Sequence, residues 1–305
     1  MRDYRLDRLK LLLMVLVVFG HLLELFRGAG NLYRVIYSFH MPAFLFLSGY
    51  FADVRRLPQI LRLYLLFQLL YPLCDTLLFG DRFTFSLVLP DWICWYLLTL
   101  ATCLLLTKLL DKVRWQVGLS VCVGVCLVWG YTDWIGYVLS LGRTLTFLPF
   151  FAAGYYARGK LPRRVPAWLR WSFWILAAGA GILIASRTEI TKRMLFGSYS
   201  YGAAGYGIGT KALLLVIGFV WIGALWTLPL SRKPGYLARL GQNTMSIYLF
   251  HGLAVRILRH FSPFGRNLAG NLLLALVCSA VLVAVFGSRW ASSAMGFFQR
   301  GRKKT

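Results

Sequence analysis

Apolar runs long enough to cross a membrane recur along the whole of this 305-residue chain. The hydrocarbon core of a bilayer takes about 20 residues of helix, and a helix satisfies its own backbone hydrogen bonds there. The pattern therefore predicts an all-α, polytopic integral membrane protein with about ten transmembrane helices in one bundle. The expected segments are 6–26, 35–53, 57–79, 92–110, 115–131, 144–157, 168–186, 211–228, 243–260 and 268–287. The shortness of 144–157 and the ambiguity of 134–141 leave the exact number open.

Composition supports the same class of protein. Hydrophobic residues make up 59% of the chain, charged residues only 14%, and the mean hydropathy is +0.65. These values lie outside the usual range of soluble domains. The longest stretch expected outside the membrane is 187–210, so we predict one transmembrane domain over residues 1–305 and no separate soluble domain.

The net charge of +24 follows a membrane topology. Lys and Arg are enriched in the loops on the cytoplasmic side of membrane proteins. An orientation with both termini in the cytoplasm places most of the positive charge inside, and we expect a multi-pass protein of the plasma membrane with no nucleic-acid partner. The inside positions include Arg2, Arg5, Arg8, Arg163, Arg164, Arg300, Arg302, Lys303 and Lys304.

The six cysteines indicate no metal site. All lie within or at the edges of apolar segments and lack the spacing of metal ligands, so they are expected to be small apolar fillers.

The first apolar segment carries three ionisable residues, Lys10, His21 and Glu24. Ionisable groups at membrane depth usually face a protein interior or a water-filled cavity and indicate function. Eleven helical steps of about 100° return to within roughly 20° of the start, so Lys10 and His21 share a face about 16 Å apart. Lys10 is then expected at one membrane surface and His21 near the middle of the hydrocarbon. Glu24 lies on the same side as His21 and can hold its tautomer or accept its proton.

A structural interpretation of the same residues remains open. Lys10 can extend its ammonium to the interface, His21 can be satisfied by a neighbouring helix, and Glu24 can lie at the far interface.

The second segment contains His40 next to a mid-helix proline, Pro42. Proline frees a backbone carbonyl and bends the helix, which can open a pocket. Arg55, Arg56 and Arg62 follow on the side expected for Lys10. Such a cluster can mark topology, bind anionic lipid, or bind the phosphates of a cosubstrate such as coenzyme A.

These motifs together resemble the acyltransferase 3 family of integral membrane O-acyltransferases, closest to the branch named for fucose 4-O-acetylase. The resemblance rests on a basic residue ahead of His21 in the first helix and on motifs that run in order along the chain. These motifs are Phe39–Pro42 leading into Leu47–Phe51 and the arginine pair, Trp95–Leu97, Phe147–Tyr155 and Leu240–His251.

The resemblance implies a bundle of about ten helices, an acyl-CoA donor used from the cytoplasm, and an acceptor hydroxyl on a glycan, a lipid-linked sugar or another small molecule. The basic residue of the first helix is often Arg in the family, whereas here it is Lys10. Lysine binds phosphate as a point charge without bidentate geometry.

Acyl transfer from a thioester to a hydroxyl needs a base that titrates near neutrality, and His21 is the candidate general base. Lys10, Arg55, Arg56 and Arg62 would bind the CoA phosphates. His40 would bind the acceptor or stabilise the oxyanion, and Glu24 or Asp75 would orient a histidine. His251 is equally compatible with a structural role, and His260 is given none.

A transporter or flippase for a glycan or lipid-linked intermediate is the second hypothesis. Ionisable residues and proline-bent helices also line transport paths. The sequence shows no inverted repeat and no matched pair of interrupted helices, which favours the O-acyltransferase. We expect an acetyltransferase that uses acetyl-CoA.

Overall fold

The computed structural model describes residues 3–162 and 165–299. Within these ranges the chain forms 14 α-helices and four short 3-10 helices, and no strand. Each of the ten segments expected to span the membrane lies on a helix. The all-helical fold predicted from the sequence is confirmed.

The long helices are α1 (Tyr4–Leu23), α2 (Gly30–Tyr50), α3 (Leu57–Phe79), α4 (Trp95–Leu110), α5 (Trp115–Val128), α6 (Leu141–Tyr156), α7 (Ala167–Ser186), α10 (Ile208–Trp226), α12 (Thr244–Phe261) and α13 (Leu268–Phe286). The other helices are η1 (Val54–Arg56), η2 (Trp92–Cys94), η3 (Trp129–Tyr131), η4 (Val138–Ser140), α8 (Lys192–Phe196), α9 (Tyr201–Ala204), α11 (Tyr236–Gln242) and α14 (Arg289–Gln299).

Among the described residues, five helical segments are long and apolar enough to cross a membrane, by length and composition. The protein is therefore a multi-pass membrane protein. These segments are Val54–Phe79, Trp92–Leu110, Ala167–Ser186, Ile208–Trp226 and Leu268–Phe286. Membrane crossing by α1, α2, α5, α6 and α12 stays a prediction.

The orientation also stays a prediction. Both chain ends lie outside the described residues, as do the basic residues Arg2, Arg163, Arg164, Arg300, Arg302, Lys303 and Lys304.

The chain divides into two compact units. Unit 1 comprises Met1–Ile36, Leu69–Thr84 and Pro229–Thr305, and unit 2 comprises Tyr37–Gln68 and Phe85–Leu228. The division falls inside α2 and α3, so each of these helices contributes to both units. The single domain expected over 1–305 is not tested by this division and stays a prediction.

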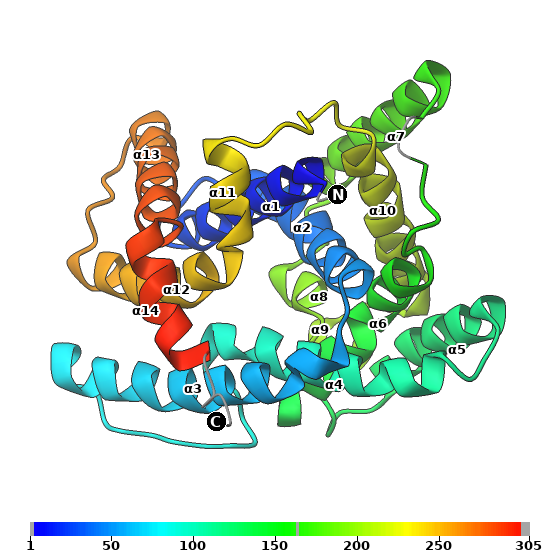
Figure 1. Ribbon diagram of the computed structural model, residues 1–305. Coiled ribbons are helices and arrows are strands. Elements are labelled where there is room, and N and C mark those ends of the chain that lie inside the picture. Colours follow the sequence, from blue (N-terminus) through cyan, green and yellow to red (C-terminus); the bar gives the residue numbers. More distant parts are fainter. Residues whose placement is uncertain (1–2, 163–164, 300–305) are drawn as a thin grey trace. The chain divides into compact units, whose positions relative to one another are not determined.

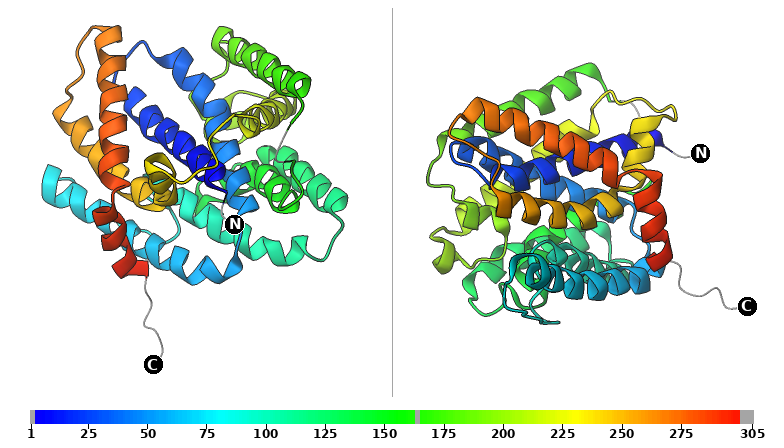
Figure 2. Two further views of the ribbon diagram at one scale, coloured as in Figure 1. Left: turned by 45° about the horizontal axis from the view of Figure 1, so that its top comes forward. Right: turned by 90° about the vertical axis from the view of Figure 1, so that its left-hand side faces the viewer.

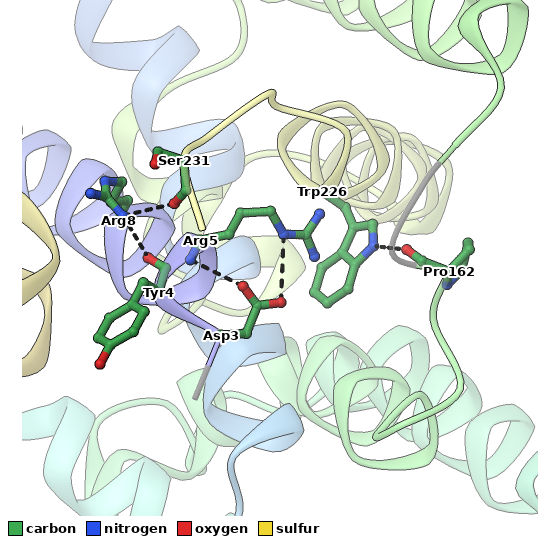
Figure 3. A network of polar contacts seen from close by, with 7 residues as sticks. All are labelled: Asp3, Tyr4, Arg5, Arg8, Pro162, Trp226 and Ser231. Carbon is green, nitrogen blue, oxygen red and sulfur yellow. Dashed lines mark hydrogen bonds and ion pairs between the residues drawn. The ribbon is translucent and has the colours of Figure 1, made fainter. Parts of the chain in front are cut away.

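Unit 1 is built around α1, which packs against α11, α12 and α13. A methyl group added at Gly241 of α11 would overlap the carbonyl oxygen of Asp7, so glycine allows this close approach. Arg8 ties the start of α1 to the segment before α11, because its guanidinium donates to the carbonyl oxygen of Ser231 at 2.7 Å (Figure 3). It also donates to the carbonyl oxygen of Lys233 at 2.8 Å. Asp3 caps the helix by accepting from the Arg5 backbone N–H at 3.1 Å.

The helices α12 and α13 lie side by side in unit 1 (Figures 1 and 2). Asn243, just before α12, donates its amide to the Gly287 carbonyl just after α13 at 2.8 Å. Asn267 caps α13 through its side-chain oxygen. Stacking between Phe26 and Phe264, with ring centroids 5.0 Å apart, joins the chain after α1 to the chain after α12.

Unit 2 places α6 against α4 and α5, and α10 against α7 (Figures 1 and 2). The second half of α2 crosses α6 at a pair of glycines. A methyl group at Gly49 would overlap the Phe151 carbonyl oxygen, and one at Gly154 would overlap the Phe46 carbonyl oxygen. The two backbones therefore touch, as at crossings of small residues in membrane helices.

Candidate active site

His21 lies in the last turn of α1. The expected segment runs to Phe26, but the helix ends at Leu23 because the chain turns through Gly28, whose φ is +93°. A positive φ of this size suits glycine and cannot continue a helix. The depth of His21 in the bilayer stays a prediction, and the structure places it near the helix end, next to the turn.

Glu24 is the C-cap residue of α1 and lies beside His21. The distance from Glu24 Oε1 to His21 Nδ1 is 3.7 Å, an ion-pair distance when the ring is protonated. Tyr33 Oη donates to the same oxygen at 2.9 Å, and Arg259 Nη2 lies 3.7 Å from Oε2. The carboxylate is thus held by a phenol and a guanidinium and can stabilise a positive His21 ring.

His251 completes this cluster from α12. Its ring stacks on His21 with centroids 5.6 Å apart, and the residue is fully buried. Nδ1 lies 3.1 Å from the Ile247 carbonyl oxygen, so the hydrogen is assigned to Nδ1. Nε2 then carries a lone pair, and it has no hydrogen-bond partner among the described residues. Sequence analysis left His251 without a role, because only the fold brings it to His21.

Lys10 forms an ion pair with Asp7, with Nζ 2.8 Å from Oδ1. The amide of Gln242 also donates to Asp7, at 3.3 Å. Sequence analysis treated Lys10 as a free cation, although Asp7 lies three residues earlier, on the same helix face. Because of this ion pair, Lys10 presents a weaker positive potential to a phosphate than an unpaired lysine does.

His40 lies in unit 2, on α2, and is 2% exposed. The edge of its ring meets the ring of Tyr37 at a centroid distance of 4.6 Å. The helix continues through Pro42, as sequence analysis expected.

Arg55, Arg56 and Arg62 lie at the start of the span that includes η1 and α3, and all three are exposed. Asp53 accepts from the Arg55 side chain at 3.0 Å, and this hydrogen bond lowers the pKa of the Asp53 carboxyl. Arg62 donates to the Pro58 carbonyl at 3.2 Å. The three guanidinium groups come from one short segment and can meet a phosphate-bearing molecule.

Asp75, considered as a partner for a histidine, pairs instead with Arg256 of α12 within unit 1. The Arg256 guanidinium also lies over the Tyr71 ring, 4.6 Å from its centroid. His260 stacks on Phe79 at 4.7 Å, in keeping with its having no assigned role.

Aromatic rings and arginines also lie together in unit 2, around Arg143 and Tyr199. The Arg143 guanidinium lies 4.9 Å from the Trp95 ring centroid and 5.3 Å from that of Tyr137. Arg193 lies 5.5 Å from the Tyr199 ring, and Tyr199 meets Tyr137 edge-on at 5.5 Å. The grouping of Tyr199 with Arg143 and Trp95 depends on the fold.

A further ionisable residue inside an apolar helix is Lys211 of α10, which is only 3% exposed. The span expected from the sequence, 211–228, begins at this residue. The helix begins earlier, at Ile208, and draws Lys211 into the protein interior.

No group of three or more His, Cys, Asp or Glu in the described part of the chain is placed to hold a metal ion. The cysteines are free thiols, and Cys94, Cys103, Cys122 and Cys126 are buried.

The comparisons with known proteins give this geometry a context. The family model of acyltransferase 3, described as an acyltransferase domain, matches residues 3–290. The chain belongs to the acyltransferase 3 family. It is also similar to the nodulation protein NolL of Sinorhizobium fredii, with 25% identity over an alignment that covers 98% of this chain and 91% of the relative. No solved structure matches.

Family membership makes this chain a membrane acyltransferase, as the motifs predicted. The matched region includes every candidate residue from Lys10 to His251. The family match does not identify the acyl donor, the acceptor or the catalytic base of this member.

Proposed function

We propose that this protein transfers an acyl group, acetyl in the first instance, from cytoplasmic acyl-CoA to a hydroxyl of a carbohydrate, a lipid-linked glycan or a related acceptor. Within its family we place it in the branch named for fucose 4-O-acetylase. The observation that carries the proposal is the pairing of His21 with a held carboxylate, Glu24, in the first helix of an acyltransferase.

His21 acts as the general base. Its ring takes the proton of the acceptor hydroxyl while the oxygen attacks the thioester carbonyl, which gives a tetrahedral intermediate. Glu24 stabilises the positive ring that forms, as the acid of a catalytic triad does. Collapse of the intermediate breaks the carbon–sulfur bond, and the proton returns from His21 to the CoA sulfur. The products are an ester and free CoA.

The arginines after α2 bind the CoA phosphates. Arg55, Arg56 and Arg62 are exposed and carry guanidinium groups suited to phosphate oxygens. Lys10 has a smaller part, because it pairs with Asp7 and its side chain is only 22% exposed, whereas Arg55, which bonds Asp53 through Nε, has a side chain that is 87% exposed.

The acceptor is a sugar. Trp95, Tyr137 and Tyr199 offer ring faces for stacking, and Arg143 and Arg193 offer hydrogen-bond donors. His40 contributes to acceptor binding or to the oxyanion. These roles follow the chemistry of the side chains.

Purified protein in liposomes tests this function with radiolabelled acetyl-CoA and a panel of sugar acceptors. We expect release of free CoA that depends on the acceptor, and a labelled ester product. A protein that moves glycan across the liposome membrane and never consumes thioester, over a broad range of acceptors, would instead be the transporter or flippase.

We propose a plasma-membrane location with both termini in the cytoplasm, since that orientation places the arginine cluster on the side of the CoA pool. A C-terminal alkaline phosphatase fusion should be inactive. An active fusion would overturn this topology and the cytoplasmic binding of CoA.

A further inference from the structure

Lys211 is a buried cation in unit 2, and the groups that contact its ammonium are uncharged. Its ammonium donates to Thr146 Oγ1 at 2.7 Å and lies over the Trp129 ring, 5.1 Å from the centroid. No carboxylate among the described residues comes within ion-pair distance of it.

Thr146 cannot balance this charge. Its hydroxyl oxygen also accepts from Trp129 Nε1 at 3.0 Å, and its own hydrogen is donated to the Gly197 carbonyl at 3.1 Å. The hydroxyl therefore accepts from two donors and donates its only hydrogen, and it carries no charge. Burying an ammonium group that contacts only a hydroxyl and an aromatic ring costs free energy, unless a negatively charged group binds beside it.

The space for such a group lies beside Lys211. A cavity of about 40 Å³ is lined by this lysine together with Tyr37, Ser38, Cys126 and Thr146. Most of the remaining wall is apolar, from Phe147, Phe150, Leu214 and their neighbours. A cavity of this size holds one small ion or the carboxylate group of a larger molecule, and an apolar wall lowers the dielectric around it, which strengthens the attraction to Lys211.

We propose that this cavity, named here the Lys211 cavity, binds a compact monovalent anion against the Lys211 ammonium. The anion is a free ion such as chloride, or a carboxylate group carried by an organic ligand. Binding needs no acyl transfer, so the proposal stands apart from the catalytic roles assigned above.

Thermal unfolding of the detergent-purified protein tests the site. Chloride, acetate and glucuronate are compared at equal sodium concentration and equal pH with the bulky buffer sulfonate MES, whose ring exceeds the cavity. At saturating chloride or acetate the midpoint should rise by about 2 to 4 °C over MES. A rise with chloride alone identifies a free-ion site, and a rise with glucuronate as well identifies a site for sugar acids. The same midpoint in all four salts would overturn the proposal.

Two variants locate the effect. Lys211→Gln keeps a donor for Thr146 but removes the charge, and it should lose the rise. Lys192→Gln, which removes an exposed lysine of the nearby helix α8, should keep it. A Lys211→Gln variant with the full rise would contradict the assignment. Where that variant yields no folded protein, bromide soaked into crystals of the wild-type protein should give an anomalous peak beside Lys211 Nζ, and the absence of a peak there would equally overturn it.

Discussion

In unit 1 the buried and half-buried charges of α1 and α12 face charges of opposite sign, whereas in unit 2 the buried Lys211 faces a hydroxyl and an indole ring. Lys10 pairs with Asp7, Arg256 with Asp75, and Glu24 lies between His21 and Arg259. Lys211 has Thr146 and Trp129. The two units therefore hold ionisable groups inside an apolar protein in different ways.

This difference separates two kinds of chemistry. In unit 1 the Glu24 carboxylate lies beside His21 and lowers the free-energy cost of the positive charge that the ring gains when it takes a proton. The ammonium of Lys211, which contacts only neutral groups, offers a binding place for an anion. Unit 1 thus suits proton transfer and unit 2 suits binding, and the following substitutions test this division.

The largest effect is expected at His21. Glutamine keeps a hydrogen-bonding side chain of similar reach but cannot accept the proton, so His21→Gln should lower kcat by about a hundredfold or more. Acetyl transfer is measured at saturating substrates on equal amounts of folded protein.

His251→Gln is the matched control from the same ring pair. It should lower kcat by about tenfold at most, because its imidazole has no carboxylate at Nδ1, which bonds the Ile247 carbonyl. A hundredfold loss in His251→Gln with near-normal turnover in His21→Gln would move the base to His251.

The next effect concerns the helix crossing that supports unit 2. Gly154→Ala puts a methyl group into the Phe46 carbonyl oxygen and should cost about 1–3 kcal/mol of stability. Thermal unfolding in detergent measures this cost.

Two further alanines give the comparison. Gly241→Ala meets the Asp7 carbonyl oxygen in unit 1 and should cost a similar amount, whereas Gly179→Ala on α7 meets open space and should be neutral or slightly stabilising. Equal midpoints for all three variants would show that neither crossing is as close as described.

A smaller effect is expected at the exposed arginines. Arg55→Ala or Arg56→Ala removes a contact to phosphate and should raise the apparent KM for acyl-CoA about 3- to 10-fold with little change in kcat. Steady-state kinetics at a fixed acceptor concentration measures both constants.

Arg187→Ala is the control for Arg55→Ala, because Arg187 is also exposed and also pairs with a carboxylate two residues away, Glu189. It should leave both constants unchanged. Arg55 and Arg56 variants that lose only protein level, with normal activity per folded molecule, would assign these residues to topology.

The smallest effect is a dependence of stability on pH at Asp91. Burial raises the pKa of this carboxyl from 3.8 to about 6 in the folded protein. Between pH 4 and 6 the unfolded chain releases the proton while the folded chain keeps it, so stability falls as pH rises through this window and levels off above it. With solvent screening the fall is about 1 kcal/mol.

Asp91→Asn should remove this fall and leave the rest of the pH profile intact. The difference between the unfolding midpoints of the wild type and the variant, followed from pH 4 to 7, is the measurement. A difference that stays constant over the range would show that Asp91 titrates at its ordinary pKa.

Much of the fold could be predicted from the sequence, because lipid offers no hydrogen-bond partners to the backbone. Each apolar run must satisfy its backbone internally, so all ten expected segments became helices. The short helices α8, α9 and α11 were not expected, because their few residues carry no periodic pattern long enough to recognise.

Only part of the candidate site could be predicted from the sequence. Both the ionisable residues of the first apolar segment and the resemblance pointed to His21, and helix spacing placed Glu24 beside it. The stacking of His251 on His21 and the burial of Lys211 could not be derived, since both depend on which helices pack against each other. The pairing of Lys10 with Asp7 was accessible from a three-residue spacing and was overlooked.

Single-turnover transfer by His21→Gln tests the central claim most directly, because a steady-state rate can be limited by product release. Excess protein is mixed with labelled acetyl-CoA and acceptor, and bound acetyl-CoA and ester are measured in the same sample. We predict normal acetyl-CoA binding with ester formation slowed about a hundredfold or more. Ester formation at the wild-type rate would remove His21 from the proton transfer and with it the role assigned to unit 1.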